Sequence, residues 1–266
     1  MEHEAIEIKP YEKVVMVVNK KNNEIKKIKY DKLFFSTGAE PLIPKIKNAY
    51  EFLNKGVFVV KTLEDANNIK NFIDKNKITA VSVVGAGAIG LEMAHSFKAL
   101  GLNVNIFEMF PQPFPKVLDP EIAEIVKSEI EKLNIELHLN SRVDEIVVQN
   151  GQIIGIKSGD SFFSSQAVIL ATGVVPNTKI LEGSVNMEKS YIIVNERMQT
   201  SNPDIYAAGD CILVKNLIDG TSMPVQLATT AAKQGIVAGI NISGHNAVYS
   251  GALGTFVSKI GNMEVA

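Results

Sequence analysis

The sequence has few of the residues on which several common kinds of protein chemistry depend. Cys211 is the only cysteine among 266 residues, so the chain can form no internal disulfide and no C-x-x-C metal or redox pair. No apolar run approaches the ~18 residues of a membrane-spanning helix. The N-terminal segment also lacks the apolar core of a signal peptide. We therefore expect a cytoplasmic protein that contacts no membrane.

The chain also lacks an excess of charge of either sign. Its 27 basic and 29 acidic residues give a net charge of −2 at pH 7, so electrostatics gives no reason to expect nucleic acid as a partner. Hydrophobic residues make up 46% of the chain. This content and the chain length suit a globular protein of one large or two ordinary domains.

The clearest motif lies at residues 81–108. A valine-rich strand pattern leads into G-x-G-x-x-G at Gly85, Gly87 and Gly90, and a helical pattern follows. A second strand pattern then ends at Glu108. This sequence of strand, glycine-rich turn, helix, strand and acid is typical of a dinucleotide-binding βαβ unit.

Each glycine of the motif has a physical reason. Gly85 permits the tight turn, Gly87 lets a pyrophosphate approach the backbone, and Gly90 lets the helix pack closely on the strand. The helix N-terminus offers N–H groups to the phosphates. The residues expected to bind the dinucleotide here are Gly85, Gly87, Ala88, Ile89 and Gly90. The alternatives are a glycine-tolerant turn in another α/β protein, or a site for another adenosyl ligand.

Glu108 bears on the choice of cofactor. It lies 18 residues after Gly90, where a carboxylate can bond both ribose hydroxyls. A 2′-phosphate would meet this carboxylate, and the first basic residue after it is Lys116. We therefore predict NAD in preference to NADP, and NADH in preference to NADPH.

Two further helices are indicated by their capping residues. One begins after Thr62, where Asp65 completes a capping box, and the other begins after Asp119, with Pro120 as its first residue. Apolar spacing predicts the buried faces, which comprise Leu63, Ala66, Ile69 and Phe72 in the first helix and Ile122, Ile125, Ile130 and Leu133 in the second.

The pattern on either side of these helices repeats. Short alternating strands before residue 31 lead to a run that ends in Thr37 and Gly38, and similar strands within 143–166 lead to a run that ends in Gly173. We interpret this as an internal repeat of two α/β units, each with an inserted β-meander.

The order of these motifs resembles that of the pyridine nucleotide-disulfide oxidoreductases, and within them the NADH oxidase and coenzyme A-disulfide reductase branch. The resemblance is carried by STGAEP, VVGAGAIGLEMA, ATGVVPNT, TSNPDIYAAGDC and LATTAAKQG. It implies an α/β fold of two Rossmann-like dinucleotide-binding domains, each with three layers built from a parallel sheet and a β-meander. The implied domains are an incomplete FAD-binding domain at 1–56 and 180–246, an NAD-binding domain at 57–179, and the start of an interface domain at 247–266.

The resemblance also implies which residues bind the cofactors. Asp210 matches the acid that bonds the FAD ribityl chain. It lies at a strand end, where a carboxylate can accept hydrogen bonds from two hydroxyl groups. Many relatives carry an aromatic residue at the position of Ala88, where it can screen the nicotinamide pocket. The other matched positions are backbone crossovers and a helix start: Thr37, Gly38, Gly209, Ala228 and Thr229 for FAD, and Gly173 for NAD.

The activity implied by the resemblance is that of an FAD-dependent NAD(P)H oxidoreductase. NADH would reduce FAD by hydride transfer, and the flavin would pass electrons to a thiol, a disulfide or oxygen. One alternative is an electron-transfer reductase that serves a ferredoxin or rubredoxin and needs no redox cysteine. Another is an inactive fragment that only binds NAD.

The resemblance further implies that the chain is the middle of a longer enzyme. An N-terminal FAD motif and a redox cysteine would precede Met1, and a dimerisation domain would continue past Ala266. We therefore expect a homodimer for the full-length enzyme. For this chain we expect residues 57–179 to fold by themselves.

Four reactive side chains have plainer interpretations. Cys211 has no partner thiol and is expected to be a small buried residue. His95 and His138 have no neighbouring acid or cysteine pattern and are expected to be structural. Glu92 lies in the first turns of the glycine-motif helix, where it either faces the nicotinamide or complements the helix N-terminus. The sequence therefore predicts no catalytic and no metal-binding residue in this chain.

Overall fold

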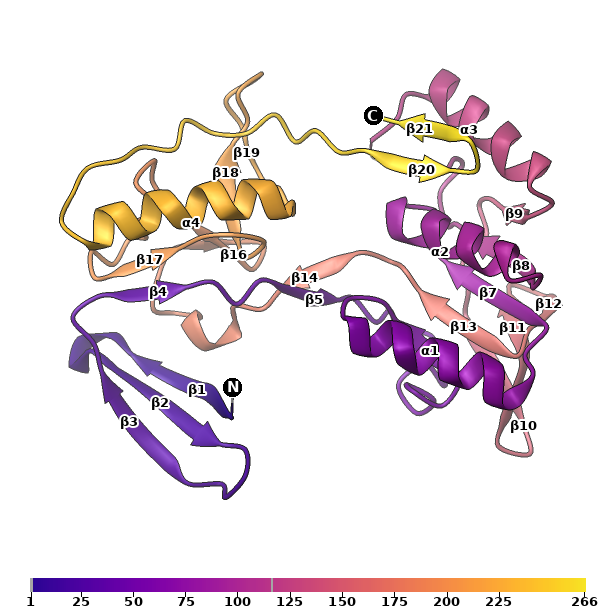
Figure 1. Cartoon of the computed structure of the whole chain (residues 1–266), viewed down its shortest axis with the longest axis horizontal. Helices are drawn as coiled ribbons and strands as arrows, with labels where there is room; N and C mark the ends of the chain where they lie inside the picture. Colours follow the sequence, from indigo (N-terminus) through magenta and orange to yellow (C-terminus); the bar gives the residue numbers. More distant parts are fainter. Residues whose placement is uncertain (1, 116) are drawn as a thin grey trace. The chain divides into compact units, whose positions relative to one another are not determined.

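The computed structural model describes residues 2–115 and 117–266, and Figure 1 traces the chain through them. The chain divides into two compact units, and each unit is assembled from two separate stretches of sequence. Unit 1 comprises Met1–Glu40 and Val175–Phe256, and unit 2 comprises Pro41–Val174 and Val257–Ala266. Lys116, the first basic residue after Glu108, lies outside the described residues.

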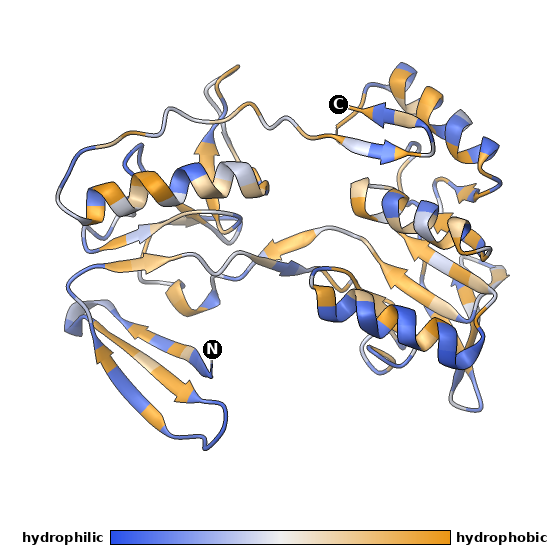
Figure 2. Ribbon diagram, in the orientation of Figure 1, coloured by the Kyte–Doolittle hydropathy of each residue, from blue (hydrophilic) through white to orange (hydrophobic). Residues whose placement is uncertain are grey.

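Unit 2 is built on a five-stranded parallel sheet. Its order is β6-β13-β7-β8-β9, formed by β6 (Val57–Val59), β7 (Ala80–Val84), β8 (Asn103–Phe107), β9 (Glu136–His138) and β13 (Ala167–Leu170). The central strands are short apolar runs because both faces of a parallel sheet are covered. Figure 2 shows β13 and most of β7 in hydrophobic colours. The predicted α/β class with a parallel sheet is confirmed.

Three helices link successive strands of this sheet: α1 (Leu63–Asn76), α2 (Ala88–Ala99) and α3 (Pro120–Lys132). The capping box of α1 is confirmed, because the Asp65 N–H donates to Thr62 Oγ1 at 3.1 Å and the Thr62 N–H donates to the Asp65 carboxylate at 2.8 Å. Asp119 is the N-cap of α3 as predicted, but its side chain makes no capping hydrogen bond.

The buried faces of α1 and α3 differ in part from those predicted, although Ile69 and Ile130 are buried as expected. Helix α1 buries Ile69 and Ile73, whereas Leu63 is 79% exposed, since it lies about 120° around the helix axis from Ile69. Helix α3 buries Ala123, Val126 and Ile130. Its predicted core residues Ile122 and Ile125 are 46% and 57% exposed, because the buried face is centred one residue further along the chain.

A three-stranded antiparallel meander completes the core of unit 2. It consists of β10 (Glu145–Gln149), β11 (Gln152–Ser158) and β12 (Ser161–Ser164). Three of its isoleucines, Ile146, Ile153 and Ile156, share a cluster with Val84 and Phe107 of the parallel sheet. The segment before β6 joins that cluster through Ile46 and Ala49. Residues 41–56 therefore lie in unit 2, whereas the sequence analysis placed them in the first domain.

The last ten residues also belong to unit 2. They form the hairpin β20 (Ser258–Ile260) and β21 (Met263–Val265), which lies beside α2 and α3 in Figure 1. Ser258 Oγ donates to Glu92 Oε1 at 2.9 Å. This hairpin packs on unit 2, whereas we expected it to begin a separate interface domain.

Unit 1 combines the N-terminal meander with small sheets and one helix. The meander is antiparallel and consists of β1 (His3–Lys9), β2 (Val14–Asn19) and β3 (Ile25–Lys29), and η1 (Pro10–Glu12) lies between β1 and β2. A parallel pair follows, β4 (Leu33–Phe35) and β17 (Ile205–Ala207). The remaining elements are η2 (Lys179–Leu181), β15 (Met187–Glu188), β16 (Tyr191–Ile193), β18 (Ile212–Lys215), β19 (Ser222–Met223) and α4 (Ala228–Ile242).

The two Thr-Gly segments of the internal repeat have matching hydrogen bonds. The Thr172 hydroxyl donates to the carbonyl of Leu42 at 2.8 Å, and the Leu42 N–H donates at 2.9 Å to the carbonyl of the glycine after Thr172. In the other repeat, the Thr37 hydroxyl donates to the carbonyl of Asn177. The Asn177 N–H in turn donates to the carbonyl of Gly38 at 2.9 Å. The short strands beyond them, β5 (Ala39–Pro41) and β14 (Val174–Pro176), pair with each other. The predicted repeat is therefore present in the backbone.

Along the described part of the chain, no helix combines the length and the apolar character that crossing a membrane requires.

Candidate cofactor-binding sites

The glycine-rich turn of unit 2 joins β7 to α2. Gly85 has φ +107°, and a Cβ on it would lie 2.4 Å from the carbonyl oxygen of Ala171. A Cβ on Gly90 would lie 2.0 Å from the Gly85 carbonyl oxygen. By contrast, a Cβ on Gly87 would meet nothing within 4 Å. Gly85 and Gly90 are therefore required by packing, whereas Gly87 leaves space above the turn.

That space lies at the N-terminus of α2. Gly87 is the N-cap and has no side chain to accept from the first-turn N–H groups, and Ala88 and Ile89 begin the helix. Unpaired N–H groups and the helix dipole give this end a partial positive charge. The turn thus has the shape and polarity that a pyrophosphate needs.

Glu108 lies directly after β8, beside this turn. It is 6% exposed, and its carboxylate accepts two backbone hydrogen bonds. Oε2 accepts from the Ala86 N–H at 2.9 Å, and Oε1 accepts from the Phe110 N–H at 3.0 Å. Each carboxylate oxygen has a second lone pair. Glu108 therefore holds the glycine turn in place and can still accept hydrogen bonds from ribose hydroxyls.

The predicted NAD residues of unit 2 lie at one edge of its sheet. Val84 at the end of β7 lies in register with Phe107 of β8 and with Leu170 of β13. Gly173 follows β13, has φ +98°, and would meet nothing within 4 Å if it carried a Cβ. The glycine turn, Glu108 and Gly173 therefore come together at the carboxyl ends of neighbouring parallel strands, where ligands bind in α/β sheets.

The predicted FAD residues of unit 1 come together in the same way. Strands β4 and β17 run parallel with Phe35 opposite Ala207, so Thr37 and Gly38 after β4 and Gly209 and Asp210 after β17 leave the same edge. Gly38 and Gly209 have φ +67° and +86°, conformations that favour glycine. The Thr37 hydroxyl already donates to a backbone carbonyl, which leaves only its oxygen lone pairs for a ligand.

The start of α4 presents exposed backbone. Ala228 and Thr229 are exposed, and the N-cap Leu227 offers no side-chain cap. The Asp210 carboxylate is partly exposed. These features fit a ligand that brings acceptors to a helix N-terminus and hydroxyl groups to a carboxylate.

Sequence reasoning missed Gln234, which lies on α4 and bonds the turn after β17. Its Oε1 accepts from the Gly209 N–H at 2.8 Å, and it is 1% exposed. The only available indication was a glutamine among the small residues of LATTAAKQG, and nothing in that pattern shows a contact with a residue 25 positions earlier.

The other reactive side chains take structural positions, as predicted for Cys211 and His138. Cys211 is fully buried, its Sγ lies 3.3 Å from the Ala208 carbonyl oxygen, and burial raises the pKa of its thiol. The His138 ring stacks on Phe107 with ring centroids 4.6 Å apart. Glu92 bonds the C-terminal hairpin, as described above. Among the described residues, no group of three or more His, Cys, Asp or Glu could hold a metal ion.

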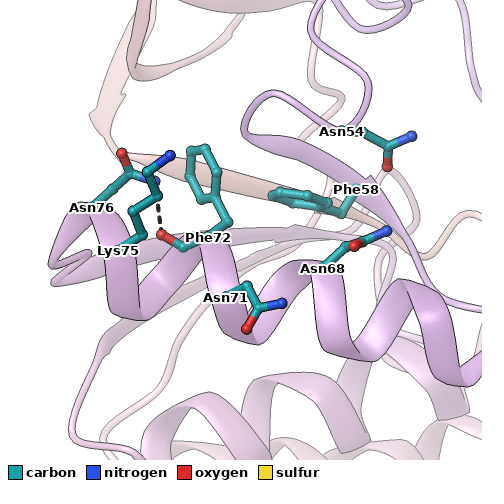
Figure 3. A pocket seen from close by; sticks show the side chains of 7 residues that line it. All are labelled: Asn54, Phe58, Asn68, Asn71, Phe72, Lys75 and Asn76. Carbon is teal, nitrogen blue, oxygen red and sulfur yellow. Dashed lines mark hydrogen bonds between the residues drawn. The ribbon is translucent and has the colours of Figure 1, made fainter.

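One hollow of unit 2 is lined by none of the residues predicted to bind a cofactor. Figure 3 shows its lining side chains, which come from α1 and the segment around β6: Asn54, Phe58, Asn68, Asn71, Phe72, Lys75 and Asn76. Its volume is about 430 Å³. The Asn76 amide donates to the Phe72 carbonyl at 2.8 Å. The hollow is lined by no Asp, Glu, His, Cys or Ser and lies away from the glycine-rich turn, so we do not take it as the candidate site.

Comparison with known proteins identifies the family. The profile of the family described as "Pyridine nucleotide-disulphide oxidoreductase" matches residues 1–235. The chain belongs to this family. The resemblance on which the sequence analysis relied is therefore confirmed.

Individual members of the pyridine nucleotide-disulfide oxidoreductase family match nearly the whole chain. An NADH oxidase of Methanocaldococcus jannaschii is 42% identical over 264 residues, which are 96% of this chain and 58% of the relative. A CoA-dependent NAD(P)H sulfur oxidoreductase of Pyrococcus furiosus is 34% identical over 92% of this chain and 55% of its own length. The chain thus spans a little over half the length of these curated relatives.

Solved structures of the family have the same fold. An NAD-dependent persulfide reductase from A. fulgidus superposes with a TM-score of 0.92 and 31% identity, and the match covers 99% of this chain and 48% of that one. Both units of the present chain are therefore included in the shared architecture.

Proposed function

We propose that this chain carries the NADH-binding unit and part of the FAD-binding unit of a flavoprotein oxidoreductase. The complete enzyme would pass electrons from NADH through FAD to a thiol, a disulfide or oxygen. The observation that carries this proposal is the open turn at Gly87, flanked by the α2 N-terminus and by the buried carboxylate of Glu108.

In this proposal unit 2 binds NADH. The first-turn N–H groups of α2 hold the pyrophosphate, and Gly87 lets it approach the backbone. Glu108 accepts hydrogen bonds from the ribose hydroxyls, and its charge disfavours a 2′-phosphate. Ala88 leaves the nicotinamide side of the turn without an aromatic cover.

Unit 1 binds the flavin nucleotide in part. Asp210 accepts hydrogen bonds from ribityl hydroxyls, and the backbone at Ala228 and Thr229 faces the flavin ring edge. When bound, FAD supplies the redox chemistry of the enzyme. The residues of this chain bind and orient the two cofactors, and Cys211, which is buried, takes no part in electron transfer.

The names of the relatives favour this function over the alternatives. The relatives at 42% and 34% identity are an NADH oxidase and a CoA-dependent sulfur oxidoreductase. Neither name describes a reductase for a small iron protein. A homodimer stays a prediction for the full-length enzyme.

A visible absorption spectrum of the purified chain, with and without added FAD and NADH, tests the proposal. We expect the purified chain to retain the visible absorbance of oxidised flavin and to lose it on anaerobic addition of NADH. A colourless chain that still binds NADH would limit the function to unit 2. A chain that binds neither cofactor would refute the proposal for this chain.

A further inference from the structure

Gln234 connects helix α4 to the turn that carries Asp210. Its Oε1 accepts from the Gly209 N–H at 2.8 Å. A carboxamide has only one oxygen acceptor, so this bond fixes the direction of the whole side-chain amide. The Nε2 group must then face away from Gly209, and it is buried without a hydrogen-bond partner among the described residues.

A second buried amide on the same helix shows that the fold can satisfy such a group. Asn241 lies seven residues after Gln234, close to the same face of α4, and is 5% exposed. Its Nδ2 lies within 3.1 Å of the carbonyl oxygens of Arg197, Val237 and Ala247, and its Oδ1 accepts from a backbone N–H. Buried polar groups are nearly always paired in this way. Among the described residues, the buried amide of Gln234 is therefore held by its one bond to Gly209, whereas the amide of Asn241 is held by four hydrogen bonds.

The position of Gln234 suits a role at the flavin side of unit 1. Gly209 has φ +86°, and a Cβ on it would lie 3.6 Å from Ala231 Cβ, so α4 packs directly against the turn. Gln234 follows Ala231 by three residues on the same helix, so both side chains lie on the side of α4 that contacts the turn. Asp210 is the next residue after the bonded amide. The bond to Gln234 therefore restrains the backbone from which the Asp210 carboxylate projects.

We propose that Gln234 is a positioning residue for the flavin nucleotide. Its Oε1 holds the Gly209 turn in the conformation from which the Asp210 carboxylate reaches the ribityl chain. This inference rests on the proposed function, since it names the residue that holds the turn next to Asp210. It assigns no chemical step to Gln234.

The first tests use the wild-type chain and need no variant. In the 266-residue chain without cofactor, hydrogen exchange followed by NMR should show a protected Gly209 amide. Addition of FAD should shift the backbone amide signals of Gly209 and Asp210, while the side-chain amide signals of Asn241 stay unchanged. An unprotected Gly209 amide would overturn the positioning role. Unshifted Gly209 and Asp210 signals in a chain that has taken up FAD would overturn the placement of this turn at the nucleotide.

The second tests compare Gln234→Met with Asn241→Leu, which each remove one buried amide from α4. We expect Gln234→Met to speed exchange of the Gly209 amide and to weaken FAD binding, measured by quenching of flavin fluorescence, each by roughly tenfold or more. Asn241→Leu should lower the melting temperature and leave the Gly209 exchange rate within about threefold of wild type. Equal exchange rates in Gln234→Met and wild type would overturn the proposal.

Failure of this inference can be told apart from failure of the proposed function. If the wild-type chain takes up no FAD, the proposed function fails for this chain. The exchange rate of the Gly209 amide in Gln234→Met would still decide the positioning role, because that measurement needs no cofactor.

Discussion

Oε2 of Glu108 accepts a hydrogen bond from the Ala86 N–H at 2.9 Å, and this contact ties the end of β8 to the glycine turn between β7 and α2. The same residue that the sequence analysis expected at the ribose is therefore also part of the turn. In the proposed function, cofactor choice and the shape of the glycine turn would both depend on this one buried carboxylate.

We expect Glu108→Gln to weaken NADH binding by about tenfold and to lower the free energy of unfolding by about 1–3 kcal/mol, because a carboxamide can accept only one of the two backbone hydrogen bonds. Titration of NADH fluorescence and urea unfolding measure the two effects. Glu92→Gln is the control, since Glu92 bonds the C-terminal hairpin, and it should leave NADH affinity unchanged. A Glu108→Gln chain that binds NADH like wild type would contradict the assignment.

Alanine at Gly87 and at Gly90 should have opposite consequences. A Cβ at position 90 lies 2.0 Å from a backbone carbonyl oxygen, so we expect Gly90→Ala to destabilise unit 2 by about 1–3 kcal/mol through overpacking. A Cβ at position 87 meets nothing within 4 Å, so Gly87→Ala should fold normally and lose NADH affinity. Melting temperature and NADH titration of both variants check this pair. Normal NADH affinity in Gly87→Ala would show that no ligand approaches that position.

Cys211 should be inert in the native chain. Because burial raises the pKa of its thiol, little thiolate forms near neutral pH, and the thiolate is the reactive species. We expect a disulfide reagent such as Ellman's reagent to react slowly at pH 8 in buffer and rapidly in 6 M guanidinium chloride. Cys211→Ala should keep whatever NADH binding the wild type shows. Rapid modification of the native chain would argue for an accessible thiol instead.

His138 should make the stability of unit 2 depend on pH. Burial lowers the pKa of its ring, and the nearby Glu136 offsets only part of this effect. The unfolded chain then binds a proton at a higher pH than the native chain, so stability should fall as pH drops from about 7 through the ordinary histidine range near 6.5. The fall should level off below the native pKa. Urea midpoints between pH 7.5 and about 5 measure the slope.

The variant His138→Phe separates this effect from other titrations. It keeps an aromatic ring against Phe107 and removes the titrating group, although it also leaves Asn105 without the 3.0 Å contact to His138 Nε2. Its absolute stability can therefore change, but its pH slope should be smaller than that of wild type. An unchanged slope would place the pH dependence on other groups.

Local pattern predicted much of the fold. The strand–glycine turn–helix unit, the two meanders and the capping box at Thr62 each depend on residues close together in sequence, and the structure confirms them. The buried faces of α1 and α3 were predicted only in part, with Ile69 and Ile130 confirmed, because several apolar stripes fit a helical period. Ala123 takes the buried place that Ile122 was expected to take, and burial depends on the sheet against which the helix packs.

The parts of the candidate sites that escaped prediction depend on distant partners. Gln234 bonds an amide 25 residues earlier, and Thr172 bonds a carbonyl 130 residues earlier. Glutamine and threonine are also common on protein surfaces, so the residue type alone does not indicate these long-range hydrogen bonds. The assignment of the hairpin at 258–265 to unit 2 depends likewise on its packing against α2, which lies more than 150 residues earlier in sequence.

The arrangement of the two units along the sequence has a kinetic consequence. The parallel sheet of unit 2 draws all its strands from residues 57–170, whereas β4 of unit 1 must wait for β17, with Leu33 opposite Ile205. During synthesis unit 2 can therefore fold first. Once it has done so, Leu42 and Gly173 are bonded, and the long loop between β4 and β17 is already largely closed. The entropy of closing that loop is thereby reduced, so we expect a substitution that slows the folding of unit 2 to delay the folding of unit 1 as well.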